Sequence, residues 1–476
     1  MTTQSNATVG LPKGESGSQF FHRILSETAA QFPKALELAH LPTSRAEFKK
    51  SYGDDLCRFE AARIGSPQRV AIARHLSSAT LASLRYGDAP LLEALQKSVP
   101  APPVSRTAPS APTLHAEVPF EGRAYRDREV ASLAERLFGD HHLTAATRDA
   151  LLWIVEHIAA QGGTLDLRGQ RFALLGASAE ISPAPMLLAA GAEVLWIDMK
   201  TPPQQAGVTH PAQPSDLLGQ PQTVAAMVRQ FAADGPVHLG LLAYAPGKSR
   251  ELGLAAVMNA LVQTLGPQVV RSVFMFISPT SPAEMQPEDL AVVAARARSP
   301  ALWQRALVVT RVLKQPGFSG HDRNAVSRAI ISLQGQGYQA AQYFAKIASA
   351  EAWAADGLAG TSITVSANVA GITNTRSLAH PLFQLAFEGA SAFGIRVFAT
   401  ETTRALAGLL MLHDILNPNA PGAAARAYPC AEDKARTLRS QQIHGGVYDL
   451  AWQFDSVVRV GAVIGMSRRP NLLWKR

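Results

Sequence analysis

A glycine-led turn stands between an apolar run and a helix start. The run FALLGASAEIS, residues 172–182, passes from residues that suit a buried strand into Gly176 and the small residues 177–179. Gly176 permits a tight turn, and small side chains let a ligand approach the backbone. Ser182 can cap the next helix and Pro183 fits its first position. Amides at such a helix start can hold a phosphate, so the turn is either a cofactor cradle or an ordinary strand-to-helix connection.

A carboxylate follows at the spacing expected of a ribose ligand. EVLWID, residues 193–198, ends in Asp198, twenty-two residues beyond Gly176. A carboxylate at this point can accept hydrogen bonds from both hydroxyls of an adenosine ribose. Asp198 would repel the 2′-phosphate of NADP, while Lys200 could offset that repulsion. We therefore expect NAD as the cofactor, with NADP as the alternative.

The elements that would position these groups alternate between short apolar runs and helical patterns. Several of the runs are apolar on both faces, as in a parallel sheet covered by helices on both sides. The expected fold is doubly wound, Rossmann-like α/β. The expected strands are 171–178, 193–198, 237–245, 269–278 and 362–371, and the expected helices are 185–191, 223–235, 254–266, 338–355 and 403–416.

Composition divides the remaining chain. Residues 98–114 carry five prolines and almost no large apolar side chains, which is typical of a semi-extended linker. The helical residues before it are therefore expected to form a separate module. We assign residues 1–97 to an N-terminal helical module, 98–125 to a Pro-rich linker, 126–168 to a helical segment, 169–415 to a Rossmann-like NAD(P)-binding domain, and 416–476 to a C-terminal extension.

Charge and cysteine content limit the partners and the compartment. The net charge of +8 is spread over 17% charged residues, and its one dense cluster is the tail 468–476. No nucleic-acid-binding motif accompanies that tail, so we expect no nucleic-acid partner. No apolar run is long enough to span a bilayer, and the first residues are too polar for a secretory signal. Cys57 and Cys430 form neither a disulfide framework nor a zinc site, which favours the cytoplasm.

The order of these motifs resembles the short-chain dehydrogenase/reductase superfamily over residues 170–415. GASAEIS is similar to its Gly-x-x-x-Gly-x-Gly turn, with Glu180 and Ser182 in place of the second and third glycines. HLGLLAYAPG falls where the family carries Asn-Asn-Ala-Gly, and AGITNT is similar to its loop over the nicotinamide. The resemblance implies cofactor contacts at Gly176, Ser178, Ile181, Asp198, Asp216 (to adenine), Gly247, Lys346 and Thr373.

The resemblance also implies a proton relay from Tyr to Lys. YQAAQYFAKIASAEAWA is similar to the family's catalytic helix, in which Lys346 would be the lysine. A nearby ammonium favours phenolate, which lowers the pKa of a tyrosine that serves as proton donor. The usual Tyr-x-x-x-Lys spacing falls on Gln342. Tyr343 and Tyr338 are therefore the two alternatives, the second being close to the longer spacing of the enoyl reductase branch.

A serine hydroxyl would hold the substrate oxygen in the same family. VFMFISPTS resembles the strand that delivers it, so Ser278 is expected in this role. Because Pro279 can take the usual position, Thr280 or Ser281 are substitutes. The insertion 282–337 lengthens the connection to the catalytic helix and could shape a pocket or an interaction surface.

Two histidine pairs are expected to be structural. His141 and His142 are adjacent, so their side chains point apart, and no carboxylate or cysteine spacing supports a metal. We expect both at the surface. His413 and Asp414 fall in an apolar helix and are expected to satisfy each other.

Two further segments have ambiguous patterns. HGGVYDLAWQF, residues 444–454, could form a lid over the active cleft or a turn that docks the tail. Tyr244 and Lys248 have Tyr-x-x-x-Lys spacing, but Pro246 and Gly247 make this segment a loop, so the spacing is interpreted as coincidence.

Three classes of function remain open on this sequence. The first is an NAD(P)-dependent oxidoreductase that acts on a small carbonyl, alcohol or enoyl substrate. The second is a Rossmann-like methyltransferase, which also uses a glycine-rich turn and an acid after the second strand. The third is a nucleotide-binding scaffold that has lost catalysis. The Lys346 helix favours the first. The resemblance further implies a homo-oligomer with contacts around that helix.

Overall fold

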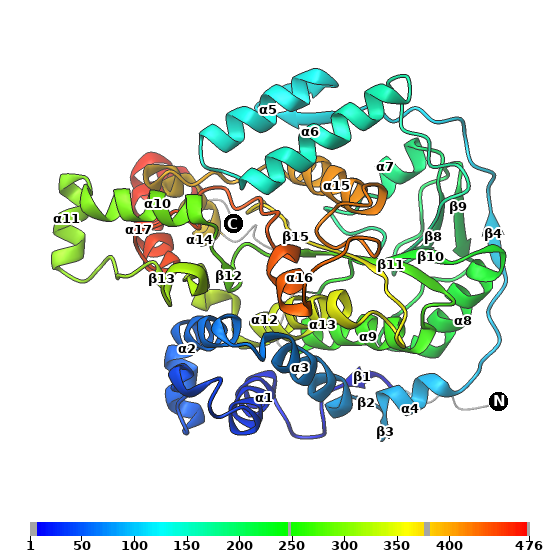
Figure 1. The fold of residues 1–476 in the computed structure, drawn as a ribbon, viewed down its shortest axis with the longest axis horizontal. Helices are drawn as coiled ribbons and strands as arrows, with labels where there is room; N and C mark the ends of the chain where they lie inside the picture. The colour runs from blue at the N-terminus through cyan, green and yellow to red at the C-terminus, as the bar shows by residue number, and fades with distance from the viewer. Residues whose placement is uncertain (1–6, 246–248, 376–380, 474–476) are drawn as a thin grey trace.

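The computed structural model describes residues 7–245, 249–375 and 381–473. It is a mixed α/β structure built on a seven-stranded, mostly parallel sheet flanked by helices (Figure 1). The sheet order is β15-β11-β10-β7-β8-β9-β4. Its strands are β4 (Val104–Arg106), β7 (Arg171–Leu175), β8 (Glu193–Ile197), β9 (Val208–Pro211), β10 (Val237–Leu241), β11 (Val270–Ile277) and β15 (Thr364–Val369).

Six of the strands are parallel, and β4 pairs antiparallel with β9 at one edge. Counted along the chain from β7, the parallel strands lie in the order 3-2-1-4-5-6. That is the order of dinucleotide-binding sheets, so the fold is compatible with a Rossmann-like α/β structure. The five expected strands are present. The sequence reading missed β9 and β4, which are short and only partly apolar.

Both faces of the sheet are covered, because successive side chains along each strand point to opposite faces. In β7, Phe172 and Leu174 pack in one hydrophobic cluster, and Ala173 and Leu175 pack in another. The helices over the first face are α5 (Arg128–Gly139), α6 (Ala145–Ala160), α7 (Ala184–Ala189) and α15 (Thr400–Leu416). Those over the second are α8 (Pro221–Phe231), α9 (Arg250–Leu265), α12 (Gln336–Ala340), the π-helix η5 (Ala341–Ala348) and α13 (Ser349–Asp356).

The N-terminal helices form a further layer beneath the second face (Figure 1). They are α1 (Gly17–Gln31), α2 (Arg45–Gly65), α3 (Arg69–Ser83) and α4 (Leu91–Gln96). Their buried side chains belong to the same hydrophobic cluster as β10, β11 and η5. We expected a boundary between modules near residue 97. The hydrophobic core continues across it, because these helices bury their apolar faces on the helices that cover the sheet. They also cover the helix that was expected to carry oligomer contacts.

A buried ionic cluster joins the N-terminal helices to the rest of the molecule. Arg63 Nη1 lies 2.7 Å from Glu351 Oε2, and Arg69 Nη2 lies 2.8 Å from Glu351 Oε1. Arg439, from the C-terminal extension, donates to Glu60 Oε1 at 2.6 Å. Burial acts to raise the pKa of Glu351, but the three guanidinium groups outweigh it and hold that pKa well below its usual value. Three parts of the sequence are thus connected by charge as well as by apolar contact.

The insertion and the C-terminal extension lie together at one end of the molecule (Figure 1). A small three-stranded sheet sits there, of β12 (Ala283–Glu284), β13 (Phe318–Ser319) and β14 (Val326–Ser327). The helices at this end are α10 (Pro287–Arg298), α11 (Leu302–Val309), α14 (Pro381–Ala390) and α17 (Phe454–Arg468), whereas α16 (Ala431–Leu438) of the extension packs against α13. The insertion packs both on the N-terminal helix α2 and on the chain's C-terminal part.

The segment 444–454 is part of this packing. Its residues from His444 to Trp452 are buried. A Cβ on Gly445 would lie 2.4 Å from the carbonyl oxygen of Arg396, so the backbone approaches too closely for a side chain. This burial favours the second alternative, a turn that docks the C-terminal part into the core.

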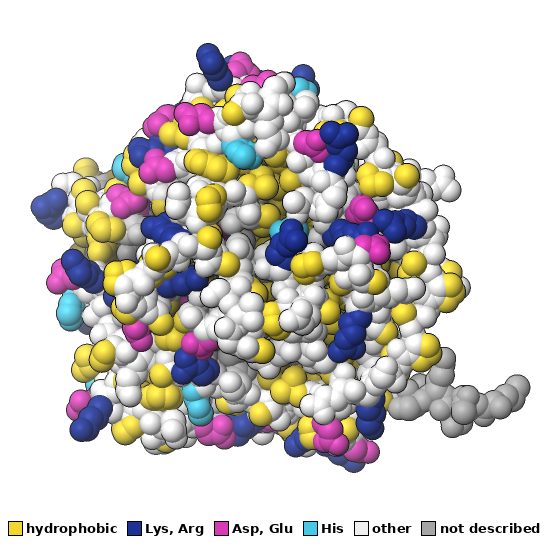
Figure 2. All heavy atoms as spheres, turned by 45° about the vertical axis from the view of Figure 1, so that its right-hand side comes forward, with side chains coloured by type: hydrophobic (Ala, Val, Ile, Leu, Met, Phe, Trp, Pro, Cys, Tyr) yellow, Lys and Arg dark blue, Asp and Glu magenta, His cyan; other side chains and the backbone are white. Residues whose placement is uncertain are grey.

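Among the helices of the described residues, none is long and apolar enough to cross a membrane. On the face in Figure 2, acidic and basic side chains are interspersed with hydrophobic ones.

Candidate functional site

The turn after β7 lies at the carboxyl edge of the sheet. Gly176 has φ +91°, and a Cβ there would lie 2.3 Å from the amide nitrogen of Ala243. Glycine is therefore required both by backbone conformation and by the close approach of the chain after β10. Ser182 Oγ accepts from the Ala184 amide at 3.3 Å where α7 begins, and Ile181 packs against the core of the first face. The tight turn predicted from the sequence has these structural causes whether or not a ligand binds.

Asp198 lies beside this turn. Its Oδ2 accepts from the Ser178 amide at 2.8 Å, and its Oδ1 accepts from the Lys200 amide at 3.0 Å. The Ser215 amide donates to the Asp198 carbonyl at 2.9 Å, which brings the segment of Asp216 to the same place. Asp216 Oδ1 accepts from the Leu218 amide at 3.0 Å. The structure thus brings the expected ribose and adenine residues to one side of the turn.

The amides of the turn are largely engaged within the protein. Gly176 donates to the Ile197 carbonyl at 2.8 Å, which continues the β7–β8 ladder. Ala179 donates to the Gly176 carbonyl at 3.0 Å, and Ser182 donates to the Ala179 carbonyl at 2.9 Å. Arg404 of α15 donates to the Glu180 carbonyl at 2.7 and 2.9 Å. Both carboxylate oxygens of Asp198 also accept from backbone amides, so a ribose would share them with the protein, and a pyrophosphate would have to compete for the turn amides.

A second group of polar side chains meets where β11 ends. Lys346 Nζ donates to the Phe276 carbonyl at 2.8 Å, and its ammonium interacts with the Glu251 carboxylate. Glu251 Oε2 accepts from the Ala245 amide at 2.7 Å. Burial lowers the pKa of Lys346 while Glu251 acts in the opposite direction, and burial raises the pKa of Glu251. The sequence reading missed Glu251, whose only signal was an acidic residue in the first turn of the helix after β10.

Tyr338 joins the same group. Its hydroxyl lies close enough to those of Ser278 and Thr280 for both to act on its pKa, and these two hydroxyls lie 2.8 Å apart. Burial raises the pKa of Tyr338 to about 12, although these hydroxyls act to lower it. Ser281 instead donates to the Ser278 carbonyl. The structure therefore brings Ser278, Tyr338 and Lys346 to the carboxyl end of one strand, with Glu251 within electrostatic reach of both Tyr338 and Lys346.

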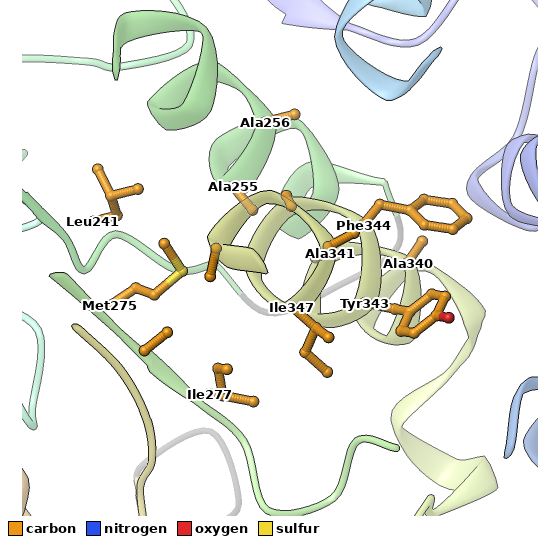
Figure 3. Close-up of a cluster of buried hydrophobic side chains, with 14 of the residues drawn as sticks. Leu241, Ala255, Ala256, Met275, Ile277, Ala340, Ala341, Tyr343, Phe344 and Ile347 are labelled. Atoms are coloured by element: carbon orange, nitrogen blue, oxygen red, sulfur yellow. The ribbon is translucent and has the colours of Figure 1, made fainter. Parts of the chain in front are cut away.

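Tyr343 lies on the other side of the helix and is not part of this group. Its hydroxyl donates to Glu60 Oε2 at 2.6 Å inside the buried ionic cluster. Figure 3 shows its ring pointing away from Met275 of β11. Burial and the Glu60 carboxylate raise its pKa well above the usual value. The sequence left two tyrosines open. Of these, the structure places only Tyr338 at the end of β11, the strand that Lys346 contacts.

Helix geometry explains this choice. Eight residues separate Tyr338 from Lys346, and two turns of an α-helix span only about seven residues. From Ala341 to Ala348 the chain is a π-helix, whose i→i+5 hydrogen bonds make each turn wider. Eight residues then come closer to two whole turns, so Tyr338 and Lys346 face the same strand end. Tyr343, three residues before Lys346, falls less than one turn away and faces the N-terminal helices.

The remaining expected cofactor residues lie apart from this group or outside the described chain. Thr373 Oγ1 is 2.6 Å from Thr403 Oγ1 and donates to the Gly371 carbonyl at 2.8 Å, so it ties the chain after β15 to α15. Gly247 lies outside the described residues, as does Lys248 of the Tyr244–Lys248 spacing. Two shallow hollows, of about 590 and 300 Å³, are lined by residues of α1 and α3 and by residues of α3, α9 and α13. Neither is lined by Asp198 or Lys346.

The histidine pairs have different outcomes. His413 Nδ1 lies 3.1 Å from Asp414 Oδ1, and Asp414 Oδ2 accepts from Ser366 and Asn368, so this pair is structural as predicted. His141 is exposed, but His142 is buried, which corrects the expectation of two surface side chains. Burial lowers the pKa of His142 to about 4.

No family model matches this chain, and no curated protein is detectably similar to it. The functional interpretation therefore depends on the geometry described above.

Proposed function

We propose that this protein is an NAD(P)-dependent oxidoreductase of the short-chain dehydrogenase/reductase type, with a doubly wound sheet and a small carbonyl, alcohol or enoyl substrate. The observation that carries the proposal is the convergence of Ser278, Tyr338 and Lys346 at the carboxyl end of β11. In open parallel sheets with this strand order, ligands bind outside that edge. Lys346 and a tyrosine on one helix, opposite a serine from a strand, match the relay that the sequence implied.

The roles of the side chains follow from their chemistry. The cofactor would supply the hydride. Tyr338 would donate its hydroxyl proton to the substrate oxygen, and Ser278 would hold that oxygen by a hydrogen bond. Lys346 would stabilise negative charge on the phenolate that remains. Burial raises the pKa of Tyr338, which keeps the phenol protonated but makes it a weaker acid, so the role needs the Lys346 ammonium to lower that pKa during proton transfer.

Asp198 supports NAD as the preferred cofactor. Its carboxylate sits beside the turn after β7, and its negative charge would repel a 2′-phosphate. Lys200, two residues on, keeps NADP as the alternative. The turn residues Gly176, Ser178 and Ile181 would lie next to the pyrophosphate.

One observation favours a second candidate, a nucleotide-binding or scaffold protein without catalysis. Most of the turn amides donate within the protein, which leaves few of them free to hold a pyrophosphate. In that case the Ser278–Tyr338 contact would be structural.

The first test is whether the protein binds a nicotinamide nucleotide at all, as the oxidoreductase must. Titration of NADH and NADPH, followed by nicotinamide fluorescence, should give saturable binding that weakens in Asp198→Ala. Asp234→Ala is the matched control, because Asp234 is an exposed acid that pairs with Arg171 below the opposite edge of the sheet. Binding that Asp198→Ala leaves unchanged would remove the assigned ribose site, and absence of binding would reject the oxidoreductase.

Catalysis is tested by the two tyrosines. With a carbonyl or enoyl substrate found by screening, Tyr338→Phe and Lys346→Met should lower kcat by about 10²–10⁴-fold, the usual contribution of a positioned proton donor. Tyr343→Phe should leave kcat within a few-fold, because its hydroxyl is committed to Glu60. A Tyr338→Phe enzyme with full activity would show that the proposed donor is wrong.

We also propose a cytoplasmic homo-oligomer. Both cysteines are free, Cys57 buried and Cys430 exposed, which suits a reducing compartment. Since α1–α3 cover the helix of Lys346, the oligomer contacts would lie on other surfaces. Light scattering of the purified chain measures the oligomeric state directly.

A further inference from the structure

The segment from Gln441 to Trp452 concentrates buried polar atoms that lack hydrogen-bond partners. Among the described residues, these atoms are the Oε1 of Gln441 and of Gln442, His444 Nε2, Tyr448 Oη, both carboxylate oxygens of Asp449, and Trp452 Nε1. Buried polar atoms in folded proteins are nearly always paired, and an unpaired group points to a bound water or ion. Two of these residues, His444 and Asp449, face a third polar side chain.

That third side chain is Asp289, in the first turn of α10. One ligand atom from each of Asp289, His444 and Asp449 lies within 4.8 Å of the others. His444 and Asp449 have no exposed surface, and Asp289 is 3% exposed. The three residues come from the insertion and from the C-terminal extension, so they connect two parts of the chain that are about 150 residues apart.

The charges at this cluster are not balanced by the side chains around it. Asp289 Oδ2 accepts from the Gln286 amide at 3.1 Å. Arg296 Nη2 is 4.0 Å from Asp449 Oδ2, and Arg296 Nη1 donates to the Asp449 carbonyl at 3.2 Å. Asp449 thus has one guanidinium at 4.0 Å, whereas Asp289 accepts from a backbone amide and faces the His444 imidazole. A buried charge without a partner is strongly unfavourable, so protons or a cation must complete the site.

We propose that Asp289, Asp449 and His444 form a structural site for a divalent transition-metal cation such as Zn²⁺. Two carboxylates and an imidazole are suitable ligands for this class of ion. A cation about 2 Å from each ligand atom requires side-chain shifts of roughly an ångström from the present spacing. The site is sealed from solvent and includes neither Lys346 nor Asp198, and a bound cation would link the insertion to the C-terminal extension.

The tautomer of His444 is part of the inference. In the structure, Nδ1 accepts from the Gly446 amide at 3.1 Å, and Nε2 lies 3.4 Å from Asp289 Oδ1. In this state the proton is on Nε2 and is directed at Asp289. Metal ligation through Nε2 moves that proton to Nδ1 and gives up the Gly446 hydrogen bond, since a ligating histidine donates from its other nitrogen. The metal then occupies the place between His444 Nε2 and Asp289 that the proton held before it moved to Nδ1.

The test is the metal content and metal response of the full chain. Protein dialysed against EDTA and then against Zn²⁺ should retain one zinc per chain by mass spectrometry, and its Tm should rise with Zn²⁺. Asp449→Asn should lower the retained zinc about tenfold or more. Glu288→Gln is the matched control, because Glu288 is adjacent to Asp289 but accepts from the Ala145 amide at 3.1 Å.

A second measurement does not depend on the folding of a variant. Co²⁺ added to the dialysed wild-type chain should give the visible absorption of a site with nitrogen and oxygen ligands, and Zn²⁺ should displace it. No zinc retained, no change in Tm and no cobalt spectrum would overturn the proposal and leave two protonated carboxylic acids in the cluster. Equal zinc retention by Asp449→Asn and by the control would also overturn it.

Discussion

At the scale of single residues, two tyrosines on one helix have opposite environments. Tyr338 contacts neutral hydroxyls at the carboxyl edge of the sheet, and Tyr343 donates to a buried carboxylate beneath the other face. The same residue type is therefore a candidate proton donor in one place and a structural donor in the other. The two roles differ because the groups around each tyrosine hydroxyl differ.

Removing the Tyr343 hydroxyl should destabilise the protein. Tyr343→Phe leaves Glu60 without one of its donors, and a hydrogen bond to a charged group contributes about 1.5–3 kcal/mol. Denaturant unfolding should show a loss of that size. Tyr52→Phe, which removes a bond to the neutral carbonyl of Ser332, should cost less, about 1 kcal/mol. Equal losses would mean that the charge of Glu60 does not matter.

The carboxylate of Glu351 should make stability depend on pH. Because its folded-state pKa is well below the ordinary value of 4.5, its contribution to stability is present above about pH 4.5 and is lost as the pH falls through the folded-state pKa. Glu351→Gln should cost about 3–5 kcal/mol at pH 7, since it leaves buried guanidinium groups without a partner. The difference from wild type should narrow between pH 4 and pH 2.

Urea unfolding of both proteins across that range measures the effect. The exposed Glu156→Gln on α6 is a suitable control and should follow wild type closely. A wild-type advantage that stays constant down to pH 2 would contradict the assignment of this titration to Glu351.

At the scale of elements, close helix contacts depend on residues without side chains. A Cβ on Gly389 of α14 would lie 1.9 Å from the Gly461 carbonyl oxygen of α17, and one on Gly465 would lie 2.0 Å from the Leu385 carbonyl oxygen. The two helices therefore touch backbone to backbone. Such a contact fixes the position of α17, which is the last long helix of the chain.

Gly389→Ala should force α14 and α17 apart. Overpacking of this kind costs about 1–3 kcal/mol, and hydrogen exchange should speed up in both helices before the rest of the molecule. Gly139→Ala is the control, because a Cβ at that helical glycine meets nothing within 4 Å. It should be neutral or stabilise by up to about 1 kcal/mol. Unchanged exchange in α14 after Gly389→Ala would show that the contact is not required.

At the scale of the whole molecule, the segments into which composition divides the chain are not separate hydrophobic cores. The linker 98–114 is mostly exposed, whereas the helices before it are buried against η5, α9 and α13. Brief trypsin treatment should cut at the exposed Lys97, directly before the linker, and not at Arg106, which is paired in β4. The two fragments should stay together on size exclusion, because they share a hydrophobic core and the Arg63–Glu351 ion pair.

The same reasoning applies to truncation. A chain that begins at residue 98 should lose the cooperative unfolding transition, since the apolar surface that α1–α3 cover would be exposed to water. A stable, cooperatively folding 98–476 fragment would show that the N-terminal helices are a separate module after all.

Local patterns in the sequence were sufficient to predict the alternation of strands and helices, the glycine turn at Gly176 and the position of Asp198 at the end of the next strand. These features depend on side-chain periodicity and on backbone sterics within a few residues. The family resemblance, and not local periodicity, selected Lys346 and left Tyr338 and Tyr343 as the two alternatives for the tyrosine.

Only the tertiary structure decided between those tyrosines, because the choice depends on a π-helix and on Glu60, almost 300 residues away in the chain. It also decided that the N-terminal helices share the sheet's core, that residues 444–454 are buried, and that Asp289 meets His444 and Asp449. Each of these depends on contacts between distant segments. The free energy of such contacts comes from burial and charge pairing that no local pattern records.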